Sequence, residues 1–410
     1  MYSSKEEILG LLKQKKISKV EAFELIKKFD QKPKSSTFSF SSENSYIRDH
    51  IVMQQRVLMG VTHCGLAIEA FRKKFVDVQS CQLKGVQFTD AIKMKPNETV
   101  DVAVELNDKN GKLFFENQYS VLGRDAIKKL TAKGEISQTK NTAPKSVDLS
   151  AFKKMSTTTL VGSEIYEKSK TELSGYGKTL WTLKNYYAIS EKECLVELAI
   201  SPEVLSQRSF YFHPALLDGA FMGSMTLSAV KDNFVPLFIK ELNVFSESPG
   251  KCYCHIKLIR SNSELVVVDM AFTDDKGNVF AEAKEFSNKR VSSMDAFGVA
   301  PNKMETSTSK NRTGKESKSV IAKNSAVSKP IMSRTGNLED KIEAYIVQSL
   351  EKIVSGSFDK QKNFLEMGIE SNNLIEMSKA IEKDVGVELY PTLFFEYQNI
   401  KALKEYFTSE

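Results

Sequence analysis

Residues 211–224 read YFHPALLDGAFMGS, an apolar and helix-like run that contains a single acidic residue, Asp218. An aspartate among leucine, alanine and phenylalanine side chains is expected to lose its hydration. That loss raises the pKa and suits the group to hold or deliver a proton. The alternative is that Asp218 simply caps the N-terminus of the helix. The run therefore predicts a buried helix with a candidate proton donor.

Two predicted hairpins of similar design lie elsewhere in the chain. Residues 102–121, VAVELNDKNGKLFFENQYSV, and residues 268–287, VDMAFTDDKGNVFAEAKEFS, each read as an apolar strand, a polar turn with a glycine, and a return strand. They align at a constant offset of 166 residues, which matches Asp108 with Asp274. The offset predicts an internal duplication, although a coincidence of turn chemistry would give the same match.

The candidate bases are four histidines: His50, His63, His213 and His255. A lone histidine near a strand is more often structural than catalytic. His50, in YIRDHIVMQQRVLMG, lies 168 residues before Asp218, close to the offset of 166 between the hairpins. The spacing therefore predicts that His50 and Asp218 occupy equivalent positions in two repeats. They would then supply one base and one acid across the interface between the repeats.

Charge is distributed unevenly along the chain. The 410 residues include 58 Lys and Arg against 52 Asp and Glu, a net charge of +6. Residues 1–300 carry 42 basic and 36 acidic groups, residues 301–336 carry eight and two, and residues 337–410 carry eight and fourteen. No aromatic residue is interleaved with the lysines after Phe297. The basic segment therefore indicates a solvated tether rather than an arm that binds nucleic acid.

Targeting signals and cysteine usage indicate the cellular compartment in which the protein is expected. The N-terminus lacks the pattern of a signal peptide, and no window approaches a membrane-spanning apolar run, so we expect a cytoplasmic protein without a membrane partner. The five cysteines are an odd number without CxxC spacing, which favours core thiols in a reducing compartment. The alternative is a metal site at Cys252, Cys254 and His255.

Residues 4–29 are predicted to form two short helices. Ser4 with Glu7, and Ser18 with Glu21, each fit the capping box, in which a serine and a glutamate satisfy each other's backbone N–H groups. Each helix has one apolar face that so small a hairpin cannot bury alone. The segment either packs on its own domain or docks a partner subunit.

Residues 337–410 read as a small acidic bundle of helices, joined to the body by a polar tether at residues 293–336. In FLEMGIESNNLIEM, residues 364–377, Ser371 follows a Gly-Ile-Glu turn at the start of an apolar-periodic helix. A serine there is by default a cap. The run nevertheless resembles the acyl and peptidyl carrier protein family, whose Gly-x-Asp-Ser motif carries 4'-phosphopantetheine on its serine, with Glu370 replacing the usual aspartate.

The closing segment, ELYPTLFFEYQNIKALKEYF, also matches the carrier family, so the resemblance covers residues 337–410. It implies a four-helix-bundle carrier domain with 4'-phosphopantetheine attached to Ser371 by a phosphopantetheinyl transferase. The acidic surroundings suit docking to basic partners.

Residues 38–292 resemble the double-hotdog dehydratase domain of modular polyketide synthases of the trans-acyltransferase type. That family carries a His-x3-Gly-x4-Pro motif in its first hotdog and an Asp-x3-Gln/His motif after a His-Pro-Ala-Leu-Leu run in its second. Here His50, the run from His213 to Asp218, and Tyr176 followed by glycine carry the resemblance. The implied fold class is α+β, a double-hotdog domain followed by the carrier bundle.

The supporting motif positions differ from those of the family. In the first motif, Gln54 replaces the glycine and Met59 replaces the proline. Lys178 replaces a proline that usually follows Tyr-Gly, and Met222 replaces the Gln or His of the second motif. Loss of the glycine changes the backbone of a turn, and methionine cannot form the hydrogen bonds of glutamine near Asp218. The motifs leave open whether dehydratase activity is intact.

The resemblance implies a lyase. His50 would take the α proton of a β-hydroxyacyl thioester, Asp218 would protonate the departing hydroxyl, and Tyr176 would contact the substrate; no metal is implied. Elimination needs both groups because hydroxide is a poor leaving group at neutral pH. Two alternatives remain open: an enoyl double-bond isomerase on the same fold, for which a base suffices, and a noncatalytic or branching scaffold.

The length of the chain indicates which partner proteins it needs. Once both domains are placed, 410 residues leave no room for a ketosynthase, an acyltransferase or a ketoreductase. We therefore expect the chain to work with an upstream ketosynthase and other polyketide synthase subunits in secondary metabolism such as antibiotic biosynthesis. Residues 1–30 would serve as a docking or linker segment, and the family implies a possible homodimer.

Overall fold

The computed structural model divides the chain into two compact units, Met1–Gly298 and Val299–Glu410, which are described separately. The description covers residues 5–31, 35–76, 78–122, 128–144, 146–171, 174–227, 233–291, 343–348, 350, 359–364, 367, 369, 371–385, 389 and 391–409. None of the helices in these ranges is long and apolar enough to cross a bilayer. The expected tether, residues 293–336, lies outside the described residues.

The N-terminal segment forms the two predicted helices, α1 (Lys5–Lys13) and α2 (Lys19–Gln31). They pack against each other through Ile8 and Ala22, which are 1% and 2% exposed. The Ser18 capping box is confirmed, because Ser18 N donates to Glu21 Oε2 at 2.9 Å and Glu21 N donates to Ser18 Oγ at 3.1 Å. The box predicted at Ser4 lies outside the described residues.

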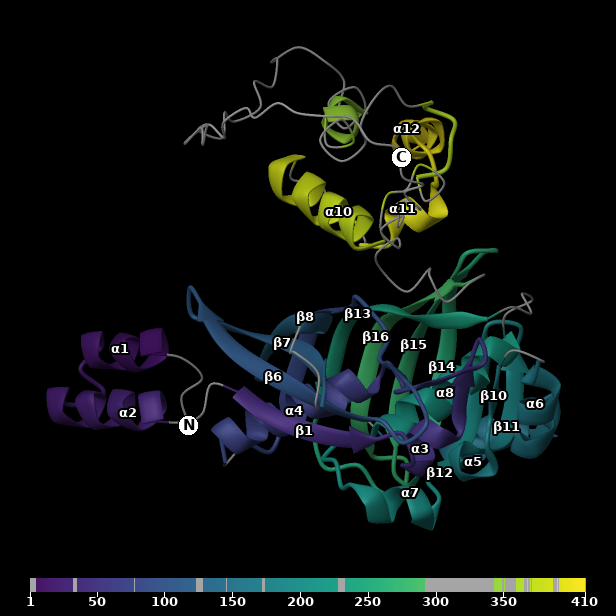
Figure 1. Ribbon diagram of the computed structural model, residues 1–410, viewed down its shortest axis with the longest axis horizontal. Coiled ribbons are helices and arrows are strands. Elements are labelled where there is room, and N and C mark those ends of the chain that lie inside the picture. The colour runs from purple at the N-terminus through teal and green to yellow at the C-terminus, as the bar shows by residue number, and fades with distance from the viewer. Residues whose placement is uncertain are drawn as a thin grey trace, which may run out of the picture. The chain divides into compact units, whose positions relative to one another are not determined.

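An antiparallel sheet of twelve strands dominates the first unit among the described residues (Figure 1). Its spatial order is β1-β6-β7-β8-β4-β13-β16-β15-β14-β12-β11-β9. The strands are β1 (Ser35–Ser41), β4 (Cys81–Phe88), β6 (Thr99–Lys109), β7 (Lys112–Val121), β8 (Lys129–Gln138), β9 (Thr158–Val161), β11 (Leu183–Ser190), β12 (Glu193–Ala199), β13 (Phe234–Val244), β14 (Lys251–Ser261), β15 (Leu265–Thr273) and β16 (Val279–Arg290).

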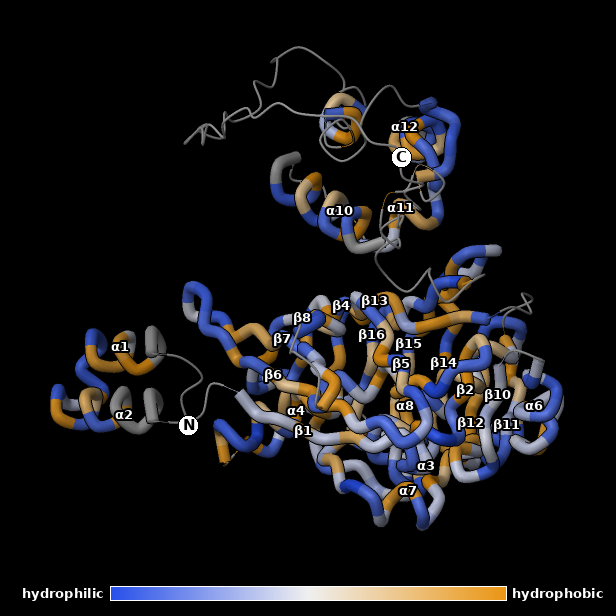
Figure 2. The backbone as a smooth tube through the Cα atoms, in the orientation of Figure 1, coloured by the Kyte–Doolittle hydropathy of each residue, from blue (hydrophilic) through white to orange (hydrophobic). Residues whose placement is uncertain are grey.

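Each half of this sheet packs against one long helix, α4 (Thr62–Lys74) or α8 (Pro214–Leu227). The strands alternate as a half-buried sheet requires; in β6, for example, Val100, Val102 and Val104 are fully buried. α8 is nearly all apolar, and Figure 2 shows hydrophobic residues along it and on the strands around it. The two halves join where β4 pairs with β13. This is the predicted double-hotdog arrangement.

The sheet is symmetric about that junction, but not with the predicted offset. Counting outward, β4-β8-β7-β6-β1 on one side corresponds to β13-β16-β15-β14-β12 on the other. The counterpart of the β6–β7 hairpin is therefore β14–β15, whereas the offset of 166 residues matched it with β15–β16. That alignment was wrong, because neighbouring hairpins of one sheet use the same turn chemistry.

A second, smaller sheet carries the candidate site. Its order is β10-β2-β3-β5. The strands are β2 (His50–Val52), β3 (Gln55–Val57), β5 (Lys93–Met94) and β10 (Gly175–Tyr176). The short helices of this unit are α3 (Ser45–Arg48), α5 (Leu149–Met155), α6 (Gly162–Ser169), the 3-10 turn η1 (Lys178–Leu180) and α7 (Pro202–Gln207).

The second unit is helical, as predicted. Residues 343–348 are helical, and α10 (Ser371–Val385), α11 (Leu393–Glu396) and α12 (Ile400–Ser409) follow. Their apolar faces meet in a core that includes Phe364, Leu374, Phe394 and Leu403, each at most 1% exposed. Leu374 lies one turn after Ser371, so the periodicity of the sequence anchors the start of α10 on this core.

Candidate active site

His50 begins β2 and is buried, with 6% of its surface exposed. Its Nδ1 lies 2.7 Å from the carbonyl oxygen of Val57 on the neighbouring strand. Because a carbonyl oxygen only accepts hydrogen bonds, Nδ1 carries the proton and Nε2 keeps its lone pair. Burial lowers the pKa of His50 to about 4. The imidazole is therefore neutral at pH 7, as a general base must be.

The turn after His50 retains the backbone of the missing glycine. β2 and β3 are joined by Met53 and Gln54 alone, and both adopt the left-handed region, with φ of 48° and 63°. Two-residue hairpin turns of this kind favour Asn-Gly. Gln54 therefore occupies a glycine conformation at some cost in stability. Met59, which replaces the usual proline, is buried at 1% exposure.

Asp218 lies in the second turn of α8 and is buried, with 7% exposed. The N-cap interpretation is wrong, because α8 begins at Pro214 and the His213 ring accepts from Ala215 N at 3.2 Å. Burial raises the pKa of Asp218 to about 7. Among the described residues, no group donates a hydrogen bond to its carboxyl. The Asp218 carboxyl is therefore protonated in a large fraction of the molecules near neutral pH.

Close packing fixes the position of Asp218. The next residue, Gly219, has no room for a side chain, because an added Cβ would come within 2.9 Å of Thr182 Cβ. The glycine lets α8 press against the segment before β11, which places the carboxyl beside aromatic residues of that region.

Tyr176 connects the two candidate groups. It stands opposite His50 in the β10–β2 pairing, with ring centroids 5.2 Å apart. Burial and then the negative charge of Asp218 raise the pKa of Tyr176 well above its usual value. The same charge acts on Tyr166, whose ring lies 5.5 Å from that of Tyr176. His50 and Asp218, which come from non-equivalent elements, thus both act on one tyrosine, His50 through a ring contact and Asp218 through its charge.

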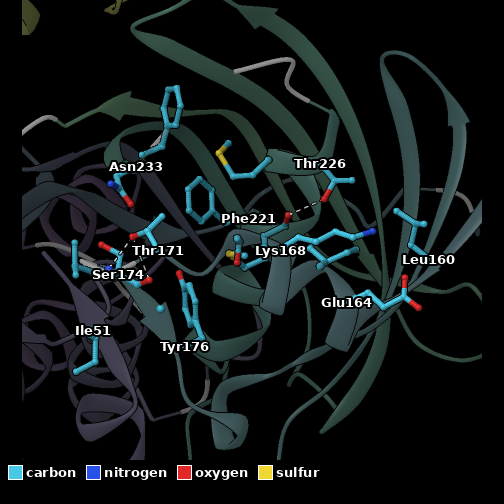
Figure 3. Close-up of a pocket in the computed structure, with 17 residues that line it drawn as sticks. Ile51, Leu160, Glu164, Lys168, Thr171, Ser174, Tyr176, Phe221, Thr226 and Asn233 are labelled. Atoms are coloured by element: carbon cyan, nitrogen blue, oxygen red, sulfur yellow. Dashed lines mark hydrogen bonds between the residues drawn. The ribbon is translucent and has the colours of Figure 1, made fainter. Parts of the chain in front are cut away.

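A cavity of about 550 Å³ adjoins this cluster (Figure 3). Glu164, Lys168 and Thr171 form an exposed polar rim. Ile165, Phe221, Met222 and Phe234 form a buried apolar floor. Its wall toward the cluster includes Ile51 and Val52, which follow His50, and Tyr176. The cavity thus combines an apolar interior with a few polar groups, as pockets for small ligands do.

Several residues that shape the site were not predicted from the sequence. The Tyr166 ring stacks on Trp181, with centroids 5.6 Å apart and planes 2° apart, and the Tyr166 hydroxyl accepts from Leu183 N at 3.2 Å. Trp181 Nε1 in turn donates to the Tyr176 carbonyl at 3.0 Å. The aromatic residues between 166 and 181 were the only available hint, and their spacing alone predicts no contact.

The other three histidines have structural partners. Asn117 Nδ2 donates to His63 Nδ1 at 3.1 Å, His213 caps α8, and His255 Nε2 lies 2.6 Å from Glu193 Oε1. At the alternative metal site both thiols are buried in the core and His255 pairs with Glu193, and the described part of the chain brings no three metal ligands together.

Ser371 is the first residue of α10, a helix of 15 residues. Its side chain lies outside the described atoms. A phosphodiester at this position would be stabilised by the free backbone N–H groups and the dipole of a helix N-terminus. The placement at the start of a long helix with a buried apolar face therefore fits the attachment of a phosphopantetheine group.

Comparisons with known families cover both units. Residues 26–120 match the polyketide synthase dehydratase domain, and residues 144–296 match the polyketide synthase dehydratase N-terminal domain. Residues 344–407 match the phosphopantetheine attachment site. Polyketide synthase PksL of Bacillus subtilis is 24% identical over 391 residues, which is 91% of this chain and 8% of PksL. The chain thus spans about a twelfth of that relative.

Solved structures share the fold of the first unit. A monomeric dehydratase domain from a trans-AT polyketide synthase split module superimposes with a TM-score of 0.57 and 22% identity, covering 63% of this chain and 98% of that one. A trans-acyltransferase polyketide synthase enoyl-isomerase gives a TM-score of 0.53 and 18% identity, covering 62% and 98%. These similarities support the double-hotdog fold and leave the reaction to the site residues.

Proposed function

The chain belongs to the polyketide synthase dehydratases and carries a phosphopantetheine attachment domain, and we propose that it converts a carrier-bound β-hydroxyacyl thioester to the α,β-enoyl thioester. One observation carries this proposal. A neutral imidazole with a free Nε2 and a carboxyl with a raised pKa lie around the same tyrosine, next to a cavity. Together they provide the base and the acid that elimination of water requires.

In the proposed reaction His50 Nε2 takes a proton from the α carbon, and the electron pair of that bond forms the double bond. The β carbon–oxygen bond breaks, and Asp218 gives its proton to the departing hydroxyl. The products are water and the enoyl thioester, and transfer of the proton from His50 to Asp218 restores both groups. The protein's part is to hold both groups in the required protonation state at neutral pH.

We assign the cavity to the substrate and Tyr176 to its wall. The buried floor suits an apolar acyl chain, and the polar rim suits the amide groups of a pantetheine arm. Met222 lies one helical turn after Asp218 and faces the cavity. Its thioether presents no hydrogen-bond donor to the carboxyl, which is consistent with the raised pKa of Asp218.

The carrier domain holds 4'-phosphopantetheine on a serine, and we assign that serine as Ser371. When attached, the group supplies the thiol that holds the acyl chain as a thioester. Ser371 would hold it at the N-terminus of α10 after reaction with a phosphopantetheinyl transferase. We also propose that the chain works in the cytoplasm, together with an upstream ketosynthase and other polyketide synthase subunits.

Loading Ser371 with a β-hydroxyacyl-phosphopantetheinyl chain tests the proposal, with intact-protein mass as the readout. The wild-type chain should lose one water, and Asp218→Asn and His50→Ala should not. Double-bond migration in a supplied enoyl chain, without loss of water from the hydroxyacyl chain, would favour the isomerase. A chain that changes neither substrate would favour the scaffold.

A further inference from the structure

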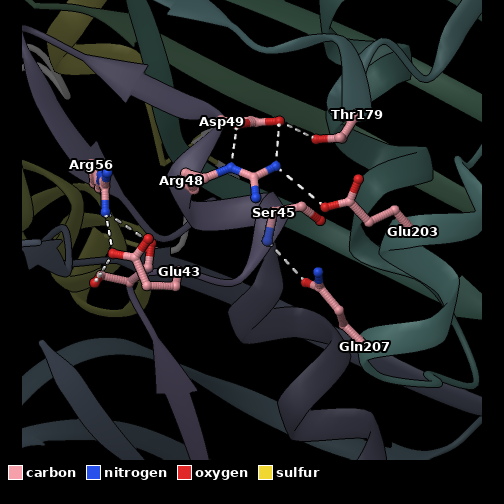
Figure 4. A network of polar contacts seen from close by, with 9 residues as sticks. Glu43, Ser45, Arg48, Asp49, Arg56, Thr179, Glu203 and Gln207 are labelled. Atoms are coloured by element: carbon pink, nitrogen blue, oxygen red, sulfur yellow. Dashed lines mark hydrogen bonds and ion pairs between the residues drawn. The ribbon is translucent and has the colours of Figure 1, made fainter. Parts of the chain in front are cut away.

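Asp49 immediately precedes His50 and joins segments far apart in the chain (Figure 4). Arg48 binds its carboxylate with Nε at 2.9 Å from Oδ1 and Nη2 at 3.2 Å from Oδ2. The Thr179 hydroxyl donates to Oδ2 at 2.5 Å. Burial would raise the pKa of Asp49, yet these hydrogen bonds keep it below its usual value. The Asp49 carboxylate is therefore charged when it accepts the hydrogen bond from the Thr179 hydroxyl.

The backbone reinforces this contact. Gly177 N donates to the Asp49 carbonyl at 2.7 Å. A Cβ at position 177 would lie 2.5 Å from Asp49 Cγ, so the glycine makes room for the aspartate side chain. On the far side of the same turn, Ser174 Oγ accepts from Met53 N at 3.0 Å. Strand β2 is thus joined to residues 174–179 at both of its ends.

These contacts flank the paired strands β2 and β10, which supply part of the wall of the substrate cavity. His50 and Tyr176 pair across β2 and β10, and their rings lie 5.2 Å apart. Ile51 on β2 and Gly175 on β10, which are also paired, both line the cavity. The strands are only three and two residues long, so their own ladder supplies few hydrogen bonds to fix this geometry. Side-chain contacts must hold the two strands in register.

We propose that Asp49 is a positioning residue, which holds the Tyr176 segment against His50 and so sets the geometry between the base and the substrate cavity. The proposal rests on the proposed function of His50 and Asp218. Asp49 acts through Tyr176 and Thr179 and touches no reacting atom.

Three substitutions in this network separate a positioning role of Asp49 from a general stabilising effect of its salt bridges. Arg48 Nη2 also reaches Glu203 on α7, 3.2 Å away, and Glu203 is exposed. Glu203→Gln removes the outer ion pair and leaves the seam between β2 and β10 in place. Thr179→Val removes only the hydroxyl that crosses the seam, and Asp49→Asn removes the charge with little change of shape. An exposed ion pair alone contributes little to stability.

The experiment measures two quantities on the full chain. The first is the rate of water loss as a function of substrate concentration, which separates kcat from KM. The second is the ring resonance of His50 at one pH, observed by histidine-selective labelling in a chain with four histidines. We expect Asp49→Asn and Thr179→Val to lower kcat about tenfold or more with KM changed less than about threefold, because a misplaced reacting group loses rate.

Both variants should also shift the His50 resonance, whereas Glu203→Gln should match the wild type in both quantities. The proposal is overturned if Asp49→Asn and Thr179→Val keep the wild-type kcat and resonance, or if Glu203→Gln behaves as they do. If the wild-type chain removes no water, the proposed function fails. The His50 resonance then decides the positioning role on its own.

Discussion

Burial acts in opposite directions on the two groups of the proposed catalytic pair. It disfavours the charged form of each, so it lowers the pKa of His50 to about 4 and raises that of Asp218 to about 7. Between these values the base is neutral and the acid is protonated. The same apolar surroundings therefore prepare both groups without a charged partner.

The activity should follow this window. As pH falls through about 4, His50 becomes protonated and cannot accept the α proton; as pH rises through about 7, Asp218 ionises and cannot donate. We expect kcat/KM to be highest between these two values and to fall as pH rises through about 7, measured by initial rates of water loss from pH 4.5 to pH 9. A flat profile from pH 6 to pH 9 would contradict the role of Asp218 as the acid.

Asp218→Asn should abolish dehydration and yet stabilise the fold at high pH. The folded pKa of about 7 lies above 3.8, the ordinary pKa of an aspartate, so the unfolded chain releases its proton first as pH rises. Stability from this group is therefore complete below about pH 4 and is lost up to about pH 7. Asparagine cannot ionise, so the free energy of unfolding of the variant, relative to that of the wild type, should grow by about 2.5 kcal/mol between pH 5 and pH 8.

Urea unfolding at the two pH values measures this difference. Asp275→Asn, in an exposed turn, is the matched control and should show no such growth. An equal effect of Asp218→Asn at both pH values would mean that Asp218 is ionised in the folded chain.

At the scale of elements, the sequence predicted what depends on local pattern. The strand–turn–strand signatures at residues 102–121 and 268–287 correspond to β6–β7 and β15–β16, and the helices α1, α2, α10 and α12 follow from apolar periodicity. The duplication offset failed because turn chemistry recurs at every hairpin. It made His50 and Asp218 seem equivalent, whereas one begins a short strand and the other lies inside a long helix.

The site was predictable only in part for the same reason. Asp218 was suggested by its apolar neighbours. His50 was suggested by a spacing that proved misleading and by a family resemblance, and Tyr176 by the resemblance alone. The contact of Thr179 with Asp49 spans 130 residues, and the stacking of Tyr166 on Trp181 depends on how α6 packs. Local sequence carries no signal for contacts that the tertiary fold creates.

The β2–β3 turn gives a prediction at this scale. Gln54 has φ of 63°, which a side chain makes unfavourable and glycine tolerates. Gln54→Gly should therefore raise the free energy of unfolding by about 1 kcal/mol. Gln55→Gly, in the adjoining strand, should lower it by about 0.5–1 kcal/mol. Chemical denaturation compares them, and destabilisation by both would show that the left-handed turn does not form.

At the scale of the whole molecule, the total charge of +6 divides by function. Residues 1–300 carry +6, the basic segment at residues 301–336 carries another +6, and the carrier segment, residues 337–410, carries −6. Opposite net charges favour encounters between a carrier and the body that it must visit. The bulk charge therefore fits delivery of an acyl chain better than binding of nucleic acid.

The N-terminal helices give the prediction at this scale. Val20 and Phe23 of α2 are 74% and 65% exposed, and Leu9 of α1 is 42% exposed. We expect Val20→Glu and Phe23→Glu to weaken association with the ketosynthase-bearing partner at least tenfold, since buried apolar anchors dominate such interfaces. Lys16→Glu, in the turn between the helices, is the control. Sedimentation or calorimetry with the partner measures this, and unchanged association after deletion of residues 1–31 would exclude a docking role.

The most direct test of the central claim follows the atoms that His50 and Asp218 are proposed to move. Ser371 is loaded with a β-hydroxyacyl chain that carries deuterium on its α carbon, and the phosphopantetheinyl fragment is weighed after reaction. The account predicts that the wild-type chain loses its β hydroxyl, as water formed with the Asp218 proton, together with one α deuterium, which is transferred to His50. The variants His50→Ala and Asp218→Asn should retain both the hydroxyl and all the deuterium. The account would be contradicted if the wild-type chain kept its hydroxyl, or if both variants lost water at the rate of the wild type.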